Sequence, residues 1–166
     1  MSKYKIAVLA PKGYETSERG GDLIDFASIE KDIELIFIDG DSDIDDIISQ
    51  CIGIKALITQ GVYKYITDLV SKVDSIKLIQ TPSAGTDWLE KSKLAELGAS
   101  VANNGGANAI SVAEHTIMLI LAIYKWLPDS HRRTVEGKWA GNSHGMDMFL
   151  MYKKTLGIIG FGNIGR

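Results

Sequence analysis

The stretch that decides the fold reads Thr155-Leu156-Gly157-Ile158-Ile159-Gly160-Phe161-Gly162-Asn163-Ile164-Gly165-Arg166. An apolar run leads directly into the pattern G-x-G-x-x-G, which predicts a strand, a glycine turn and the start of a helix. In the dinucleotide-binding βαβ unit the first glycine allows the tight turn. The second lets the backbone approach a pyrophosphate, and the third lets the helix pack closely on the sheet. We therefore expect a turn whose amides face phosphate groups.

The rest of that unit is not in the printed sequence. A complete unit continues with a helix and a second strand, and an acidic residue about 20 positions on binds the ribose. We therefore expect these 166 residues to be the front part of a longer nucleotide-dependent protein, in which the choice between NAD and NADP is made further along.

Upstream of the glycine turn, short apolar runs alternate with amphipathic stretches. This alternation predicts an α/β fold with a parallel sheet covered by helices on both faces. The predicted strands are 6–9, 33–38, 54–58, 76–79 and 100–102, and the predicted helices are 23–29, 44–51, 65–73 and 87–97.

A long helix is predicted from Asn108 to Leu127, ended by Pro128. Its apolar residues occupy more than one face, so we expect it to be buried on most sides, between domains or at a subunit interface. Residues 136–154 read as a linking loop with three glycines, and the strand of the nucleotide unit is expected to follow.

Composition excludes several classes of protein. The chain is 45% hydrophobic and 23% charged, as in ordinary globular domains, and its net charge of −3 gives no case for nucleic acid or an anionic membrane. Cys51, the single cysteine, lies among isoleucines and is expected to be buried and inert, which leaves no disulfide or thiolate metal site within the chain. No signal-peptide pattern follows Met1, so a cytoplasmic protein is expected.

Two loops carry candidate chemistry. The first, 81–87, follows a predicted strand, where ligands of open α/β sheets bind. Its small residues could expose amides to an anion, or the segment could be only a turn, with Asp87 capping the next helix. The second loop is 103–115. Its Asn108 could cap the long helix by accepting from the amide of Ser111, or it could present its own side-chain amide to a substrate. His115 is expected to be an interior residue rather than an acid or base.

Taken in order, these segments resemble the D-2-hydroxyacid dehydrogenase family, which includes the NAD-dependent formate dehydrogenases. The first matching piece is 78–80 followed by 83–87, and the other three are 108–115, 137–139 and 154–166. A lone glycine motif is a weak signal, but four pieces in the family's order at compatible distances are a strong one.

The resemblance implies a flavodoxin-like substrate domain, here residues 1–103, and a Rossmann coenzyme domain that starts within 104–166. It implies a homodimer through the Asn108–Leu127 helix. The implied reaction is hydride transfer between a small 2-hydroxy acid and NAD or NADP. The family's acid/base histidine, its carboxylate partner and its arginine all follow the glycine motif. No catalytic residue is therefore assigned within this chain, which is expected to be inactive by itself.

The resemblance carries over a narrower set of site residues. The substrate carboxylate would meet the backbone at Ala84 and Gly85, and Asn108 matches a substrate-binding asparagine of the formate dehydrogenase branch. The Ser83-Ala84 pair differs from the Gly-Val often found in this loop, so the identity of the acid stays open. The implied cofactor-binding residues are Ser111, Val112, Gly160, Phe161, Gly162, Asn163, Ile164, Gly165 and Arg166.

Two other functions remain open from the residues alone. Some relatives of this fold are co-regulators that sense NAD(H). A stand-alone flavodoxin-like module without a cofactor would leave the last ten residues disordered and fold the long helix back on its own sheet.

Overall fold

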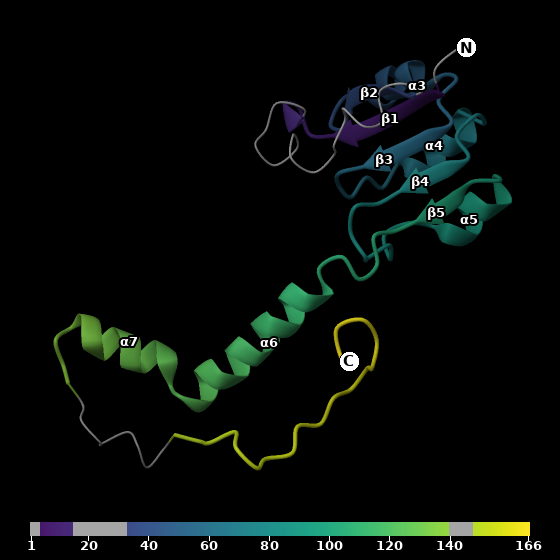
Figure 1. The fold of residues 1–166 in the computed structure, drawn as a ribbon. Coiled ribbons are helices and arrows are strands. Elements are labelled where there is room, and N and C mark those ends of the chain that lie inside the picture. The colour runs from purple at the N-terminus through teal and green to yellow at the C-terminus, as the bar shows by residue number, and fades with distance from the viewer. Residues whose placement is uncertain (1–3, 15–32, 140–147) are drawn as a thin grey trace. The chain divides into compact units, whose positions relative to one another are not determined.

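The computed structural model describes residues 4–14, 33–139 and 148–166 (Figure 1). The predicted helix 23–29 lies outside these residues, as does part of the predicted loop 136–154. The chain divides into two compact units, Met1–Gly105 and Gly106–Arg166. Their assignment as substrate domain and start of a coenzyme domain stays a prediction.

The described part of the first unit contains a five-stranded parallel sheet in the order β2-β1-β3-β4-β5. This is the strand order of flavodoxin-like folds, so the predicted α/β class is confirmed. The strands are β1 (Tyr4–Ala10), β2 (Ile33–Asp39), β3 (Ala56–Thr59), β4 (Leu78–Gln80) and β5 (Ser100–Ala102). The short helices between them are α3 (Ile44–Cys51), α4 (Ile66–Lys72) and α5 (Lys91–Glu96).

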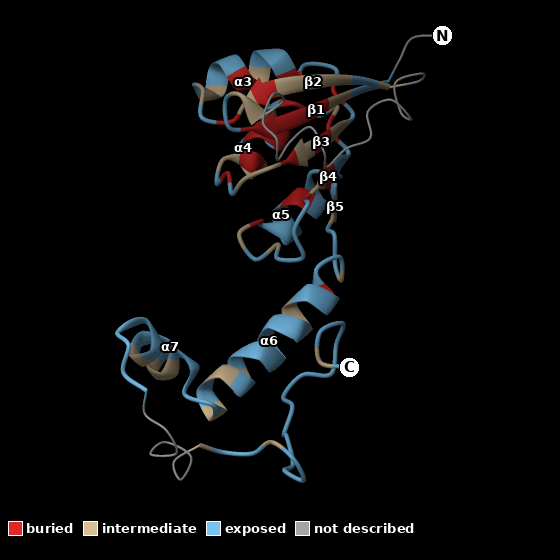
Figure 2. Cartoon of the chain, turned by 60° about the vertical axis from the view of Figure 1, so that its left-hand side comes forward, coloured by how far each residue is buried: buried red, intermediate tan, exposed pale blue. Residues whose placement is uncertain are grey.

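One row of apolar side chains crosses the whole sheet in register. The row is Ile36, Ala7, Leu57, Ile79 and Val101. These residues form one core cluster with the apolar faces of α3, α4 and α5, so these helices cover that face of the sheet. Figure 2 shows this concentration of buried residues around the strands.

The helix predicted from Asp87 begins later, at Lys91, and Asp87 is not its cap. Residues 86–89 instead form a turn, closed by the Leu89 amide, which donates to the Thr86 carbonyl at 3.1 Å. Leu89 is buried, and Trp88 packs against the core. Packing of these two side chains therefore outweighs the local capping signal.

In the second unit, Pro128 does not end the long helix as predicted. The helix α6 (Ala109–Tyr124) ends before Trp126, which takes a left-handed conformation with φ 51°. Pro128 then lies in the first turn of α7 (Leu127–Val135), where a missing N–H costs nothing because the first amides of a helix have no partner within it. Gly137, with φ 69°, ends α7 in a Schellman motif: its amide donates to Thr134, and that of Lys138 donates to Arg133.

Most of α6 is exposed in the single chain, so its burial between domains or at a subunit interface stays a prediction. Of its residues only Ala109 is buried, and large apolar side chains such as Ile110 and Ile123 are more than 70% exposed (Figure 2). His115, predicted to be interior, is also exposed.

The strand predicted at 156–159 is not formed, and described residues from Gly137 onward contain no helix or strand. A strand is stable only where a neighbour takes up its backbone hydrogen bonds, and the described part of the second unit has none to pair with it. Ile159 is accordingly fully exposed.

Candidate functional site: an amide loop and a glycine turn

The loop 81–86 follows β4 at the carboxyl edge of the parallel sheet. Two of its backbone carbonyls accept hydrogen bonds from other parts of the chain. The Ser83 carbonyl accepts from the Thr81 hydroxyl at 2.9 Å and from the Asn104 amide at 3.2 Å. The Ala84 carbonyl accepts from the side-chain amide of Asn103 at 2.7 Å. Because Thr81 is buried and Asn103 and Asn104 directly follow β5, the ends of two neighbouring strands fix this loop.

Two backbone N–H groups of the same loop, by contrast, make no hydrogen bond within the described residues. Ala84 and Gly85 are exposed, and in the described part of the chain neither backbone N–H donates to another group. A Cβ added at Gly85 would meet nothing within 4 Å, and its φ lies outside the left-handed region. The space beside Gly85 is therefore open, and two successive amides can reach a ligand there.

Asn108 precedes α6 and is exposed, but its side chain makes no capping hydrogen bond. Asn108 occupies the predicted N-cap position, but the predicted side-chain bond to the Ser111 amide is not formed. Among the described residues its side-chain amide has no partner and can reach other groups. Ser111 is exposed and Val112 is half-buried in the first turns of α6. Within the part of the chain that the structure describes, no hydrogen bond joins these residues to the glycine turn.

The segment 160–166 forms a glycine-dependent turn. Gly160 has φ 93°, where a side chain would be strained, and a Cβ at Gly165 would overlap the Gly160 carbonyl oxygen. At Gly162 a Cβ would meet nothing, so the backbone there is open to a close approach. The Arg166 guanidinium donates to the Asn163 side chain at 3.4 Å and adds a cation beside this opening.

The turn therefore fits a diphosphate in its conformation, its open space and its charge. The strand predicted before the turn is not formed in the described residues, so only the turn itself matches the expected phosphate site. The side chain of Asn163 lies against Gly106, which places the turn beside the segment that leads into α6.

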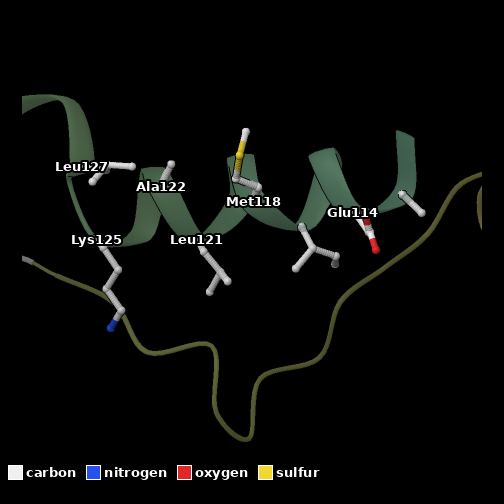
Figure 3. Close-up of a pocket in the computed structure, with 8 residues that line it drawn as sticks. Glu114, Met118, Leu121, Ala122, Lys125 and Leu127 are labelled. Carbon is white, nitrogen blue, oxygen red and sulfur yellow. The ribbon is translucent and has the colours of Figure 1, made fainter. Parts of the chain in front are cut away.

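An apolar groove of about 740 Å³ runs along α6 to the start of α7 (Figure 3). The apolar residues that line it are Ala113, Ile117, Met118, Leu121, Ala122 and Leu127. Glu114 and Lys125 also line it and are its charged members. This groove is a surface for packing rather than for chemistry.

A comparison with protein families matches residues 12–158 to the catalytic domain of the D-isomer specific 2-hydroxyacid dehydrogenases. The match covers most of the chain. The chain belongs to this family. Among curated members of the family, hydroxypyruvate reductase of Thermotoga maritima is 33% identical over 114 residues, which are 68% of this chain and 36% of that protein.

Solved structures of family members agree with the fold. An NAD-dependent formate dehydrogenase from Staphylococcus aureus, in complex with NAD, is 27% identical with a TM-score of 0.70; the match covers 97% of this chain and 49% of that one. An NADPH-dependent glyoxylate/hydroxypyruvate reductase from Sinorhizobium meliloti is 20% identical with a TM-score of 0.71, over 99% and 48% of the two chains. This chain thus spans about half the length of these solved structures.

In the described residues no group of histidine, cysteine or acidic side chains is arranged to hold a metal ion. No single described helix is long and apolar enough to cross a membrane; α6 and α7 meet that test only as a pair, and they bend by 66° at their break.

Cys51 is buried in the core, as predicted, and burial raises the pKa of its thiol from 9.0 to about 11. Since the thiolate is the reactive form, the folded chain should carry about a hundredfold less thiolate than a free cysteine below pH 9.0. Alkylation by iodoacetamide should be slow in native buffer and fast in urea.

The raised pKa of Cys51 also makes the stability of the fold depend on pH. The folded pKa lies above the ordinary value, so the contribution of Cys51 to folding is complete below pH 9.0 and is lost as the pH rises through about 11. Fast alkylation of the native chain below pH 9.0 would contradict the burial of this thiol.

The prediction from sequence overlooked Asn103, which holds this loop from the end of the neighbouring strand. The available signal was its place directly after β5, at the carboxyl edge beside β4, where polar side chains of neighbouring strands meet.

Proposed function

We propose that this chain forms the substrate-binding part, and the start of the coenzyme-binding part, of an NAD(P)-dependent oxidoreductase. The reaction is the transfer of a hydride from the CH–OH group of a small D-2-hydroxy acid. Family membership supports this proposal, and the curated and solved relatives include reductases of hydroxypyruvate and a formate dehydrogenase.

The observation that carries the proposal is the pair of unused amides at Ala84 and Gly85. Two adjacent N–H groups at the carboxyl edge of a parallel sheet suit a carboxylate, which accepts several hydrogen bonds. The carbonyls of the same two peptide groups, those of Ser83 and Ala84, already accept hydrogen bonds, so the loop keeps its conformation when no acid is bound. Asn108 is a second candidate substrate ligand through its free side-chain amide.

For the cofactor, residues 160–166 would hold the diphosphate, with the open backbone at Gly162 and the Arg166 guanidinium nearest to it. Ser111 and Val112 are proposed to line the nicotinamide end. When bound, NAD(P) would supply the hydride acceptor. The choice between NAD and NADP is left open by the residues of this chain.

These 166 residues are expected to catalyse no hydride transfer by themselves. The family's arginine and acid/base histidine are implied only after the glycine motif, and no residue of this chain is assigned to either role. The measurement is NADH absorbance, with NAD and a panel of 2-hydroxy acids and formate. Any turnover by the purified chain would overturn this expectation.

The proposed substrate contact is tested by titrating the ¹⁵N-labelled chain with hydroxypyruvate and following its amide resonances. We expect the Ala84 and Gly85 amides to shift. Gly85→Ala should weaken binding about tenfold, because its methyl group fills the space where the acid lies. Stability should change by less than about 0.5 kcal/mol, since that methyl group meets no protein atom.

Gly157→Ala is the matched control, since it too would meet nothing within 4 Å and has no positive φ. If Gly85→Ala and the unsubstituted chain bind hydroxypyruvate with equal affinity, the assigned contact at Gly85 is wrong. If neither the Ala84 nor the Gly85 amide resonance shifts with hydroxypyruvate or formate, the proposed function is wrong.

We further propose that the protein is a cytoplasmic homodimer that associates through 108–127 and binds neither nucleic acid nor membrane. The exposed apolar side chains of α6 support the dimer. The family match favours the enzyme over an NAD(H)-sensing co-regulator or a cofactor-free module, and no feature of the structure favours either alternative.

A further inference from the structure

Asn103 makes a long-range hydrogen bond in the candidate site. Its side-chain amide donates to the Ala84 carbonyl at 2.7 Å, across 19 positions of the chain. The residue lies after β5, whereas Ala84 lies in the loop after β4. The two segments belong to the same compact unit, so this contact links two neighbouring strand ends.

Peptide geometry gives this bond a consequence for the neighbouring amide. The Ala84 carbonyl and the Gly85 N–H belong to one planar trans peptide group and point in opposite directions. Fixing the carbonyl toward Asn103 therefore turns the Gly85 N–H away from it. The preceding peptide is held in the same way, because Thr81 and Asn104 donate to the Ser83 carbonyl and so orient the Ala84 N–H.

The donors to these two carbonyls differ in whether they require a particular side chain. The bond from Asn104 uses its backbone amide, which every residue except proline has, and Thr81 acts within the same loop. For the Ala84–Gly85 peptide, Asn103 is the single donor to the carbonyl in the described residues. Its side chain therefore decides whether this peptide keeps its orientation or can rotate.

We propose that Asn103 is a positioning residue for the acid substrate: it holds the Ala84–Gly85 peptide so that the Gly85 N–H faces the substrate carboxylate. This inference rests on the proposed function, and it adds a residue that makes no contact with the acid. A pre-oriented amide binds an anion without the entropy loss of ordering the loop first.

The test is the hydroxypyruvate titration of the ¹⁵N-labelled 166-residue chain, with formamide as the uncharged control ligand. In Asn103→Ala the Gly85 amide resonance should move or broaden before any ligand is added, and the affinity for hydroxypyruvate should fall about tenfold. Asn103→Gln, which keeps the amide donor, should recover part of that affinity.

Gln50→Ala is the matched control, because Gln50 also donates a side-chain amide to a backbone carbonyl, that of Asp46, but in α3. It should leave both the loop resonances and the affinity unchanged. Should Asn103→Ala not fold, Asn103→Ser takes its place, because serine stays polar but is too short to reach the Ala84 carbonyl.

The outcomes separate the two proposals. If the unsubstituted chain binds hydroxypyruvate at the loop and Asn103→Ala (or Asn103→Ser) binds it equally well, the role of Asn103 is overturned and the proposed function stands. If the unsubstituted chain shows no response at Ala84 and Gly85, the proposed function fails and this inference fails with it. A loss in Gln50→Ala as large as that in Asn103→Ala would also overturn the assignment.

Discussion

Replacing Leu57 by alanine is expected to lower the free energy of unfolding by about 2–5 kcal/mol. Leu57 is fully buried at the centre of the sheet, in register with Ala7 on β1 and Ile79 on β4. Truncation removes apolar contacts and leaves a cavity between the sheet and its helices, which neighbouring backbone hydrogen bonds keep from closing. Urea unfolding of the 166-residue chain, followed by circular dichroism, measures the change.

Ile52→Ala is the control for this effect. Ile52 is 73% exposed after α3, so the same kind of truncation should change stability by less than about 0.5 kcal/mol. Similar losses for the two variants would mean that the row across the sheet is not the centre of the core.

Replacing Leu121 by glutamate is expected to convert the proposed homodimer into a monomer. Leu121 lines the apolar groove of α6 together with Ile117 and Met118, and all of them are at least 39% exposed in the single chain. Burying a carboxylate without a partner in an apolar interface costs several kcal/mol. The dissociation constant should therefore rise by more than about a hundredfold. Sedimentation velocity over a range of concentrations gives the association state.

Ile52→Glu serves as the control, since it places the same charge on an exposed isoleucine of the first unit. It should sediment as the unsubstituted chain does. If the unsubstituted chain is monomeric at all concentrations, the dimer through α6 is wrong.

The first unit could be predicted in detail from sequence because its signals are local. The predicted helix 44–51 and the predicted strand 100–102 agree with α3 and β5 at both ends. In α3 the Asp43 side chain accepts from the Asp45 amide, and Ile47 and Cys51 form the buried face. Hydrophobic periodicity acts over a few residues, so it survives in the folded chain.

The candidate site was predicted less completely. Ala84 and Gly85 came from the resemblance and their position after a strand, and the structure adds that their amides are unused. Asn103 was overlooked because its partner lies 19 positions away, and a contact of that span depends on strand pairing. Capping by Asp87 was wrong, because α5 begins later, whereas Asn108 takes the N-cap position of α6 without the predicted side-chain bond.

By itself the sequence determined the alternation of strands and helices, the burial of Cys51 and the glycine turn, because hydrophobic period and glycine conformation are properties of short segments. Tertiary structure decided which donors hold the carbonyls of the loop after β4 and where α5 begins. It also decided that 156–159 has no strand partner among the described residues. Each of these depends on which partner a distant segment offers for a hydrogen bond or an apolar contact, and no local pattern contains that information.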